Sequence, residues 1–226
     1  MKKRNAFTLA EVLITLGIIG IVAAMTMPTL ITDARKKSTA TKVKKFYNIM
    51  NNAVQFSIAK NGDVENWMGE ARIYTYEENV QFVKDYFLPY IKYRKYEKCN
   101  ENLSQDVCVY LIPDGMFSFT YDGNGADIIY YIDGEYIISD EERTTHNLFA
   151  FQFNKRNGDN EDGTPIERDF NRKTSVEPYT FNWDGTYENL KTHPRYGCNK
   201  YSTQAKAFCT KLLQMNNWEI TDDYPW

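Results

Sequence analysis

A long apolar segment near the N-terminus restricts the fold of this chain more than any other feature. The segment covers residues 12–31 and contains no charged side chain. A helix needs about 20 such residues to cross the ~30 Å hydrocarbon core of a bilayer. The rest of the chain must be markedly polar, because the mean hydropathy of the whole chain is −0.58. The sequence therefore predicts one membrane-spanning helix followed by a polar region.

The polar region has the composition of one folded domain. The 226 residues are 42% hydrophobic, 15% aromatic and 25% charged, which provides enough apolar material for a core and excludes a disordered or collagen-like chain. The formal net charge of −3 gives no electrostatic reason to expect nucleic-acid binding.

A single carboxylate distinguishes this apolar segment from the two commonest kinds of N-terminal apolar segment. A secretory signal peptide cut near Ala23 or Ala24, or a simple uncleaved anchor, keeps its charges outside the apolar core. Glu11 instead lies within the apolar stretch, four residues after Phe7. A buried carboxylate without a partner is costly, so Glu11 is predicted to have a specific role.

The residues around Glu11 form a recognisable motif. Lys-Lys-Arg-Asn-Ala at residues 2–6 is followed by Phe-Thr-Leu-Ala-Glu-Val-Leu-Ile at residues 7–14. This run resembles the class III leader of type IV pilins and type II secretion pseudopilins. The resemblance implies that a prepilin peptidase cuts between Ala6 and Phe7, methylates the new amine of Phe7 and leaves the apolar segment in place. Ala6 stands where the family usually has glycine, and Pro28 matches a position where many members have proline.

The resemblance gives Glu11 a physical role in assembly. In a filament, packed helices would bring Glu11 of one subunit near the positive amine of Phe7 on a neighbour. Leaving either charge alone in an apolar bundle is costly, so a wrong stagger between subunits is penalised. The resemblance also implies a single-pass protein of the cytoplasmic (inner) membrane with an extracytoplasmic head, which joins a filament after assembly.

The distribution of basic residues argues for the opposite orientation. Three basic residues precede the apolar segment, whereas six follow it within residues 35–45. The positive-inside count therefore conflicts with the orientation that the resemblance implies. The lysines after the segment fit either a solvated helix face or contact with lipid headgroups.

The chain beyond Pro28 has the period of an amphipathic helix. Apolar side chains recur at steps of three and four residues, from Val43 to Ile58, and Asn61-Gly62 is a typical helix end. Together with the resemblance, which implies the leader and the assembly role, this period predicts a leader at residues 1–6, a transmembrane and assembly half of one helix at 7–31, its amphipathic half at 32–60, and a head at 61–226.

The head is predicted to contain a meander of strands and a few short helices. Thr75 and Glu78 form a capping-box spacing before an apolar stripe that ends at Pro89. Runs of β-branched and aromatic residues, separated by Asp-Gly and Asn-Gly turns, predict strands at 107–112, 116–121, 128–132, 135–139 and 147–153. Residues 154–174 indicate a long exposed loop, and 202–215 a final helix. The predicted fold class is α+β and pilin-like, with the long helix packed against an antiparallel meander.

The four cysteines fall into two local pairs. Cys99 lies near Cys108, and Cys198 lies near Cys209, so local disulfides are the simplest pairing in an exported chain. A zinc site built from all four thiolates is the alternative, but no C-x2-C spacing is present.

Few residues of the chain indicate any other chemistry. Oxygen-rich turns at residues 122–127 and 157–163 are of a kind that can hold Ca²⁺, with Asp159, Glu161 and Asp162 as weak candidate ligands, although turn formation alone explains them. No hydrolase or metalloprotease motif is present, and the two histidines, His146 and His193, lie at turn or strand positions. No catalytic residue and no required cofactor are predicted.

The predicted function is therefore structural and not enzymatic. We expect a pilin-like subunit of a type II secretion pseudopilus or type IV pilus-like filament, whose partners are prepilin peptidase, other pilin-like subunits, an inner-membrane assembly platform and membrane lipid. The alternative is a membrane-tethered module that never assembles and binds a glycan or protein through its 17 tyrosines or its acidic loop.

Overall fold

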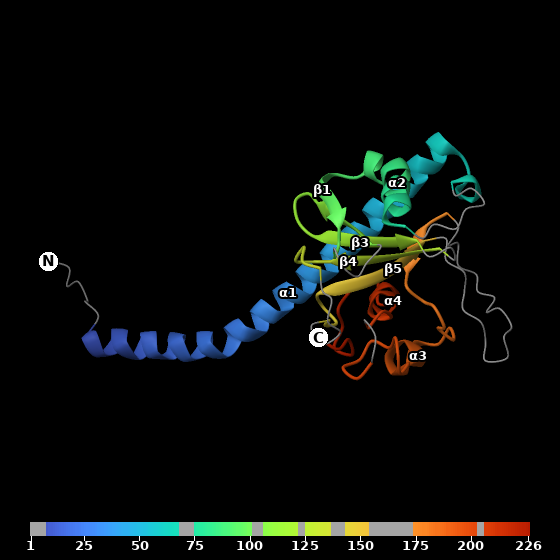
Figure 1. Ribbon diagram of the computed structural model, residues 1–226. Coiled ribbons are helices and arrows are strands. Elements are labelled where there is room, and N and C mark those ends of the chain that lie inside the picture. The colour runs from blue at the N-terminus through green and yellow to red at the C-terminus, as the bar shows by residue number, and fades with distance from the viewer. Residues whose placement is uncertain are drawn as a thin grey trace. The chain divides into compact units, whose positions relative to one another are not determined.

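The computed structural model describes residues 8–67, 75–100, 106–121, 125–136, 143–153, 174–202 and 206–226. The chain divides into two compact units, Met1–Ser38 and Thr39–Trp226. The long helix α1 (Leu9–Asn61) contributes residues to both units (Figure 1). The second unit is called the head below.

The end of α1 follows the predicted cap. Gly62 has a φ of +79°, a left-handed conformation that glycine adopts without a side-chain clash. Its N–H donates to the carbonyl of Ile58 at 2.9 Å, which completes the last turn of the helix. The predicted end at residue 60 is therefore confirmed to within one residue.

Six strands form one antiparallel sheet in the order β1-β2-β3-β4-β5-β6, which is a meander. The strands are β1 (Tyr93–Lys98), β2 (Val107–Leu111), β3 (Met116–Tyr121), β4 (Ala126–Tyr131), β5 (Leu148–Phe153) and β6 (Val176–Pro178). The β2–β3 turn requires Gly115, whose φ is +86° and where an added Cβ would lie 2.8 Å from the Tyr130 ring. The predicted α+β fold with an antiparallel meander is confirmed.

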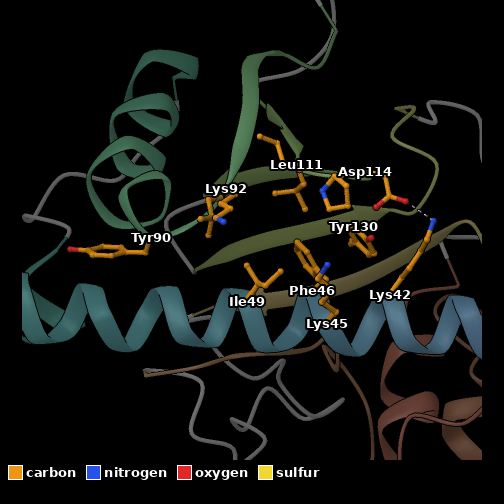
Figure 2. A pocket seen from close by; sticks show the side chains of 12 residues that line it. Lys42, Lys45, Phe46, Ile49, Tyr90, Lys92, Leu111, Asp114 and Tyr130 are labelled. Atoms are coloured by element: carbon orange, nitrogen blue, oxygen red, sulfur yellow. Dashed lines mark ion pairs between the residues drawn. The ribbon is translucent and has the colours of Figure 1, made fainter.

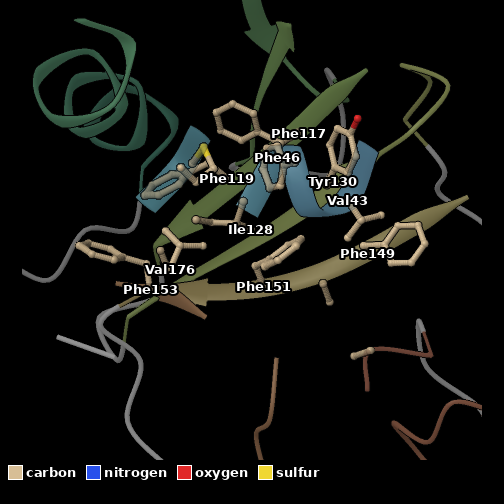
Figure 3. Close-up of a cluster of buried hydrophobic side chains, with 14 of the residues drawn as sticks. Val43, Phe46, Phe117, Phe119, Ile128, Tyr130, Phe149, Phe151, Phe153 and Val176 are labelled. Atoms are coloured by element: carbon tan, nitrogen blue, oxygen red, sulfur yellow. The ribbon is translucent and has the colours of Figure 1, made fainter. Parts of the chain in front are cut away.

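The core of the head lies between the second half of α1 and one face of the sheet. Figure 3 shows Val43 and Phe46 of α1 reaching toward the aromatic side chains of the strands. Phe46 stacks on Tyr130 of β4 with 4.3 Å between ring centroids, and it also contacts Phe117 of β3 and Phe151 of β5. The predicted apolar stripe is therefore the face of α1 that packs on the sheet.

Helix α2 (Tyr76–Tyr86) covers the same face near β2 and β3. Thr75 and Glu78 form the predicted capping box at its start. Asn79 is fully buried, and its side-chain oxygen accepts a hydrogen bond from the Tyr121 N–H at 2.8 Å, which ties α2 to β3. Two short 3-10 turns, η1 (Val64–Asn66) and η2 (Leu88–Tyr90), flank α2.

Two further helices pack near the other end of the sheet. Helix α4 (Cys209–Met215) packs on β5 and β6, and α3 (Tyr187–Thr192) packs on α4. A disulfide joins Cys198 to Cys209 at the start of α4, and a second joins Cys99 to Cys108 between β1 and β2. Both local pairs therefore exist as disulfides, and a zinc site of four thiolates is incompatible with them.

One predicted strand is wrong in the part that the structure describes. Glu135 and Tyr136 follow the turn at Ile132–Gly134 and belong to no strand, while residues 137–139 lie outside the described residues. The reason is that β4 already pairs with β3 on one side and with β5 on the other. Tyr136 instead packs on Tyr131 and donates a hydrogen bond to Asp106 at 3.1 Å. The final helix also begins later than predicted, at Cys209.

The two edge strands were missed for different reasons. β1 has the sequence Tyr-Arg-Lys-Tyr-Glu-Lys, whose charges suit an edge but mask the strand pattern. β6 has only three residues, and α1 closes its outer edge. Asn51 of α1 donates to the Val176 carbonyl at 2.9 Å and accepts from the Val176 N–H at 3.0 Å. The amide of Asn51 thus takes the place of a seventh strand at that position.

Asn51→Ala should destabilise the head by about 1–3 kcal/mol, because Val176 is fully buried and its N–H would lose its partner. The adjacent Asn52 is exposed, which makes Asn52→Ala a matched control with little expected effect. Urea unfolding followed by tryptophan fluorescence measures both. Equal losses in the two variants would show that the amide bridge contributes nothing.

Candidate functional site

The first described turn of α1 is closed by a capping box. The carboxylate of Glu11 accepts hydrogen bonds from the Thr8 N–H at 2.8 Å and the Thr8 hydroxyl at 2.7 Å. The Glu11 N–H in turn donates to the Thr8 hydroxyl at 3.3 Å. This reciprocal arrangement satisfies backbone donors that a helix start leaves unpaired. Glu11 therefore has a partner within its own chain, which the sequence prediction of its role did not include.

The helix after Glu11 presents apolar side chains on all sides. Its large aliphatic residues between Leu9 and Ile31 are each more than two-fifths exposed. Thr15, Thr26, Thr29 and Thr32 donate their hydroxyls to carbonyls one turn earlier, so their polar groups need no water. Within the described residues, this is one helix long and apolar enough to cross a membrane. An apolar surround, of lipid or of other helices, suits this surface.

The other predicted site residues are distributed over the chain. Pro28 lies inside α1, where its carbonyl accepts from the Thr32 hydroxyl at 2.9 Å. Ala6 and Phe7 lie outside the described residues, as do the candidate calcium ligands Asp159, Glu161 and Asp162. In the described parts of the chain, no group of three or more His, Cys, Asp or Glu residues is placed to hold a metal ion.

The head contains a groove that sequence reasoning did not identify. It has a volume of about 530 Å³ and lies between α1 and the β2–β3 turn (Figure 2). Its apolar floor includes Phe46, Ile49, Leu111 and Tyr130. Its rim carries Lys42, Lys45, Lys92 and Asp114. We call it the lysine-rimmed groove.

The rim of the groove carries unbalanced positive charge. Lys42 pairs with Asp114 at 2.9 Å, drawn as a dashed line in Figure 2. Lys45 and Lys92 are exposed and form no ion pair with any residue in the described parts of the chain. Burial, together with the nearby Asp114 and Asp133, raises the pKa of Tyr130, so its phenol remains neutral. The groove therefore combines an apolar floor with two uncompensated cations.

One wall of the groove can be predicted from the sequence. Lys42, Lys45 and Ile49 follow steps of three and four residues, which places them along one flank of α1. The opposite wall comes from the β2–β3 turn and from Ile91 and Lys92, which are far from α1 in the sequence. Only the packing of the sheet on α1 brings these walls together.

Comparison with known protein families assigns the chain to one family. A model described as a family of unknown function (DUF6613) matches residues 29–226. The chain belongs to the DUF6613 family. A second model, described as the prokaryotic N-terminal methylation motif, matches residues 1–27 of this DUF6613 protein. Comparisons with curated proteins and with solved structures give no match.

The two matches meet at Pro28 of the DUF6613 protein, which lies between them and belongs to neither. The methylation motif confirms the resemblance of the N-terminus to type IV pilins and pseudopilins, and it marks the chain as a type IV pilin-like precursor. Such a motif implies processing by a prepilin peptidase. The DUF6613 match covers the whole head, including the lysine-rimmed groove.

Proposed function

We propose that this DUF6613 protein is a structural subunit of a filament, either a type II secretion pseudopilus or a type IV pilus-like fibre. A prepilin peptidase cuts between Ala6 and Phe7 and methylates the amine of Phe7. The observation that carries the proposal is the methylation motif at residues 1–27, which overlaps a helix long enough and apolar enough to span a membrane.

Assembly in this proposal proceeds through α1. The exposed apolar surface of its first part is surrounded by lipid before assembly and by helices of other subunits afterwards. The amine of Phe7 on one subunit pairs with Glu11 on a neighbour, which selects one stagger. Partners would be an inner-membrane assembly platform and other pilin-like subunits.

The head lies on the extracytoplasmic side in this proposal. Its two disulfides support that side, because disulfides persist in oxidising compartments. Each closes a short loop and stabilises the head by about 2–3 kcal/mol on loop-entropy arguments. A head stabilised by disulfides suits a subunit that is exposed outside the membrane.

Intact mass measurement tests the processing step. The full chain is recovered from membranes of cells that contain a prepilin peptidase, and its N-terminus is fragmented. We expect a chain that begins at methylated Phe7. A start near residue 24 would show a released secreted domain, and an intact Met1 would show an unprocessed anchor, so either would contradict the proposal.

Sedimentation of sheared surface material tests the assembly step. The processed protein is expected in the filament pellet when the assembly machinery is present. Processed protein that stays entirely in the membrane fraction would instead favour a tethered module that binds a glycan or protein without assembling.

A further inference from the structure

The lysine-rimmed groove exposes apolar surface beside positively charged side chains. Half-buried Ile49 lies at its floor, and Ile112 at its edge is 49% exposed. Apolar surface of this kind beside Lys45 and Lys92 matches a partner that carries both an apolar group and negative charge.

The same head carries a surface with that chemistry near α3. Tyr187 is 37% exposed, Glu188 follows it in α3, and it contacts Asp223, which follows Asp222. The Tyr187 hydroxyl donates to Asp223, which also lies 3.7 Å from Lys191. Glu188 and Asp222 are exposed and form no ion pair with other described residues. We call Tyr187, Glu188, Asp222 and Asp223 the acidic patch.

The groove and the acidic patch are built from different elements of the head. The groove lies beside α1, β1 and the β2–β3 turn, whereas α3 is held by α4, which packs on β5 and β6. Figure 1 shows β1 and α3 at opposite ends of the head.

We propose that the acidic patch of a second copy of this chain docks in the lysine-rimmed groove. Glu188 and Asp222 of one copy would face Lys45 and Lys92 of the other, and Tyr187 would cover the apolar floor. Tyrosine is favoured at such positions because it buries a large ring and keeps a polar end. This inference deepens the proposed filament function, because it assigns a contact between heads.

Charge also excludes one symmetric form of this contact. A two-fold contact that placed groove against groove would bring Lys45 and Lys92 against the same lysines, which is repulsive. Groove against acidic patch pairs opposite charges, and in its heterologous form it adds copies in one direction without closing on a dimer. That is the symmetry a filament requires.

Zero-length carbodiimide coupling tests the contact directly, because it joins an amine to a carboxylate only when they touch. Detergent-solubilised full-length chains labelled with heavy nitrogen are mixed with unlabelled chains, coupled and digested. We expect peptides that join Lys45 or Lys92 of one isotope to Glu188 or Asp222 of the other. The absence of these mixed peptides, or mixed peptides only at other residues, overturns the proposal.

Charge exchange provides the matched variants. Lys45→Glu with Lys92→Glu removes the reacting amines and reverses the charge of the rim, so the mixed peptides at these positions should be lost. Adding Glu188→Lys and Asp222→Lys should restore the yield. Lys44→Glu is the control, because Lys44 is exposed beside Lys45 on α1 but does not line the groove. Equal losses with Lys44→Glu, or failure of the exchange to restore coupling, contradict the proposal.

The test does not depend on filaments. Mixed peptides in detergent without any filament in cells would support the contact while the proposed function fails. Filaments that pellet normally without these peptides would leave the proposed function standing and overturn the contact. Coupling of Lys45 to a different protein would show another occupant and also overturn it.

Discussion

Replacing Phe46 with alanine is expected to destabilise the head by about 3–5 kcal/mol. Phe46 is only 2% exposed, and its ring contacts aromatic rings on three successive strands of the sheet. Removing it leaves a cavity at the junction of α1 with β3, β4 and β5, where the neighbouring rings are held by strand pairing. The loss is a large fraction of the about 5–15 kcal/mol by which a typical domain is stable.

The control for this prediction lies on the same helix. Phe56 is 61% exposed, so Phe56→Ala removes an equally large ring from a largely solvated position. Its expected cost is below about 1 kcal/mol. Urea unfolding followed by tryptophan fluorescence isolates the head, because all four tryptophans, Trp67, Trp183, Trp218 and Trp226, lie in Thr39–Trp226. Similar losses for the two variants would show that α1 is not anchored through Phe46.

The second large effect is expected in assembly. Glu11→Gln should abolish or strongly reduce the filaments that sediment from sheared cells, while processing and membrane insertion continue. The glutamine keeps an oxygen that can accept from the Thr8 N–H, so the capping interaction is largely retained. Only the charge that would pair with the Phe7 amine of a neighbour is lost. This expectation rests on the proposed function.

Thr8→Ala is the complementary variant. It removes the hydroxyl that bonds both the Glu11 carboxylate and the Glu11 N–H, but it leaves the charge in place. The loss of a cap of this kind costs about 1 kcal/mol, so filaments should still form. If Glu11→Gln assembles normally and Thr8→Ala does not, Glu11 acts as a helix cap and the register hypothesis is wrong.

Local patterns were sufficient for most elements of the head. The capping box at Thr75, the Asn61-Gly62 helix end and the hairpin turn at Asp114-Gly115 were predicted correctly, because each depends on backbone chemistry within a few residues. The strands with alternating or continuous apolar side chains were found for the same reason. The local cysteine pairs also required little more than short spacing and an exported chain.

Local patterns do not predict which strands pair when they are far apart in the sequence. Residues 135–139 have the composition of a strand, but β5 takes the place beside β4 that such a strand would need. β6 exists because β5 pairs with it on one side and Asn51 of α1 bonds its other edge, 125 residues away in the sequence. No property of Val-Glu-Pro alone predicts a strand.

The amino-acid pattern is sufficient to predict a pilin-type N-terminus, an apolar helix long enough to span a membrane, and an α+β head. These features depend on residue type and local period, which a linear pattern contains. Only the tertiary structure reveals the partners of Asn51 and the lysine-rimmed groove. The groove needs two walls that are separated by more than 40 residues, and only the burial of Phe46 against the sheet brings Lys45 beside the β2–β3 turn.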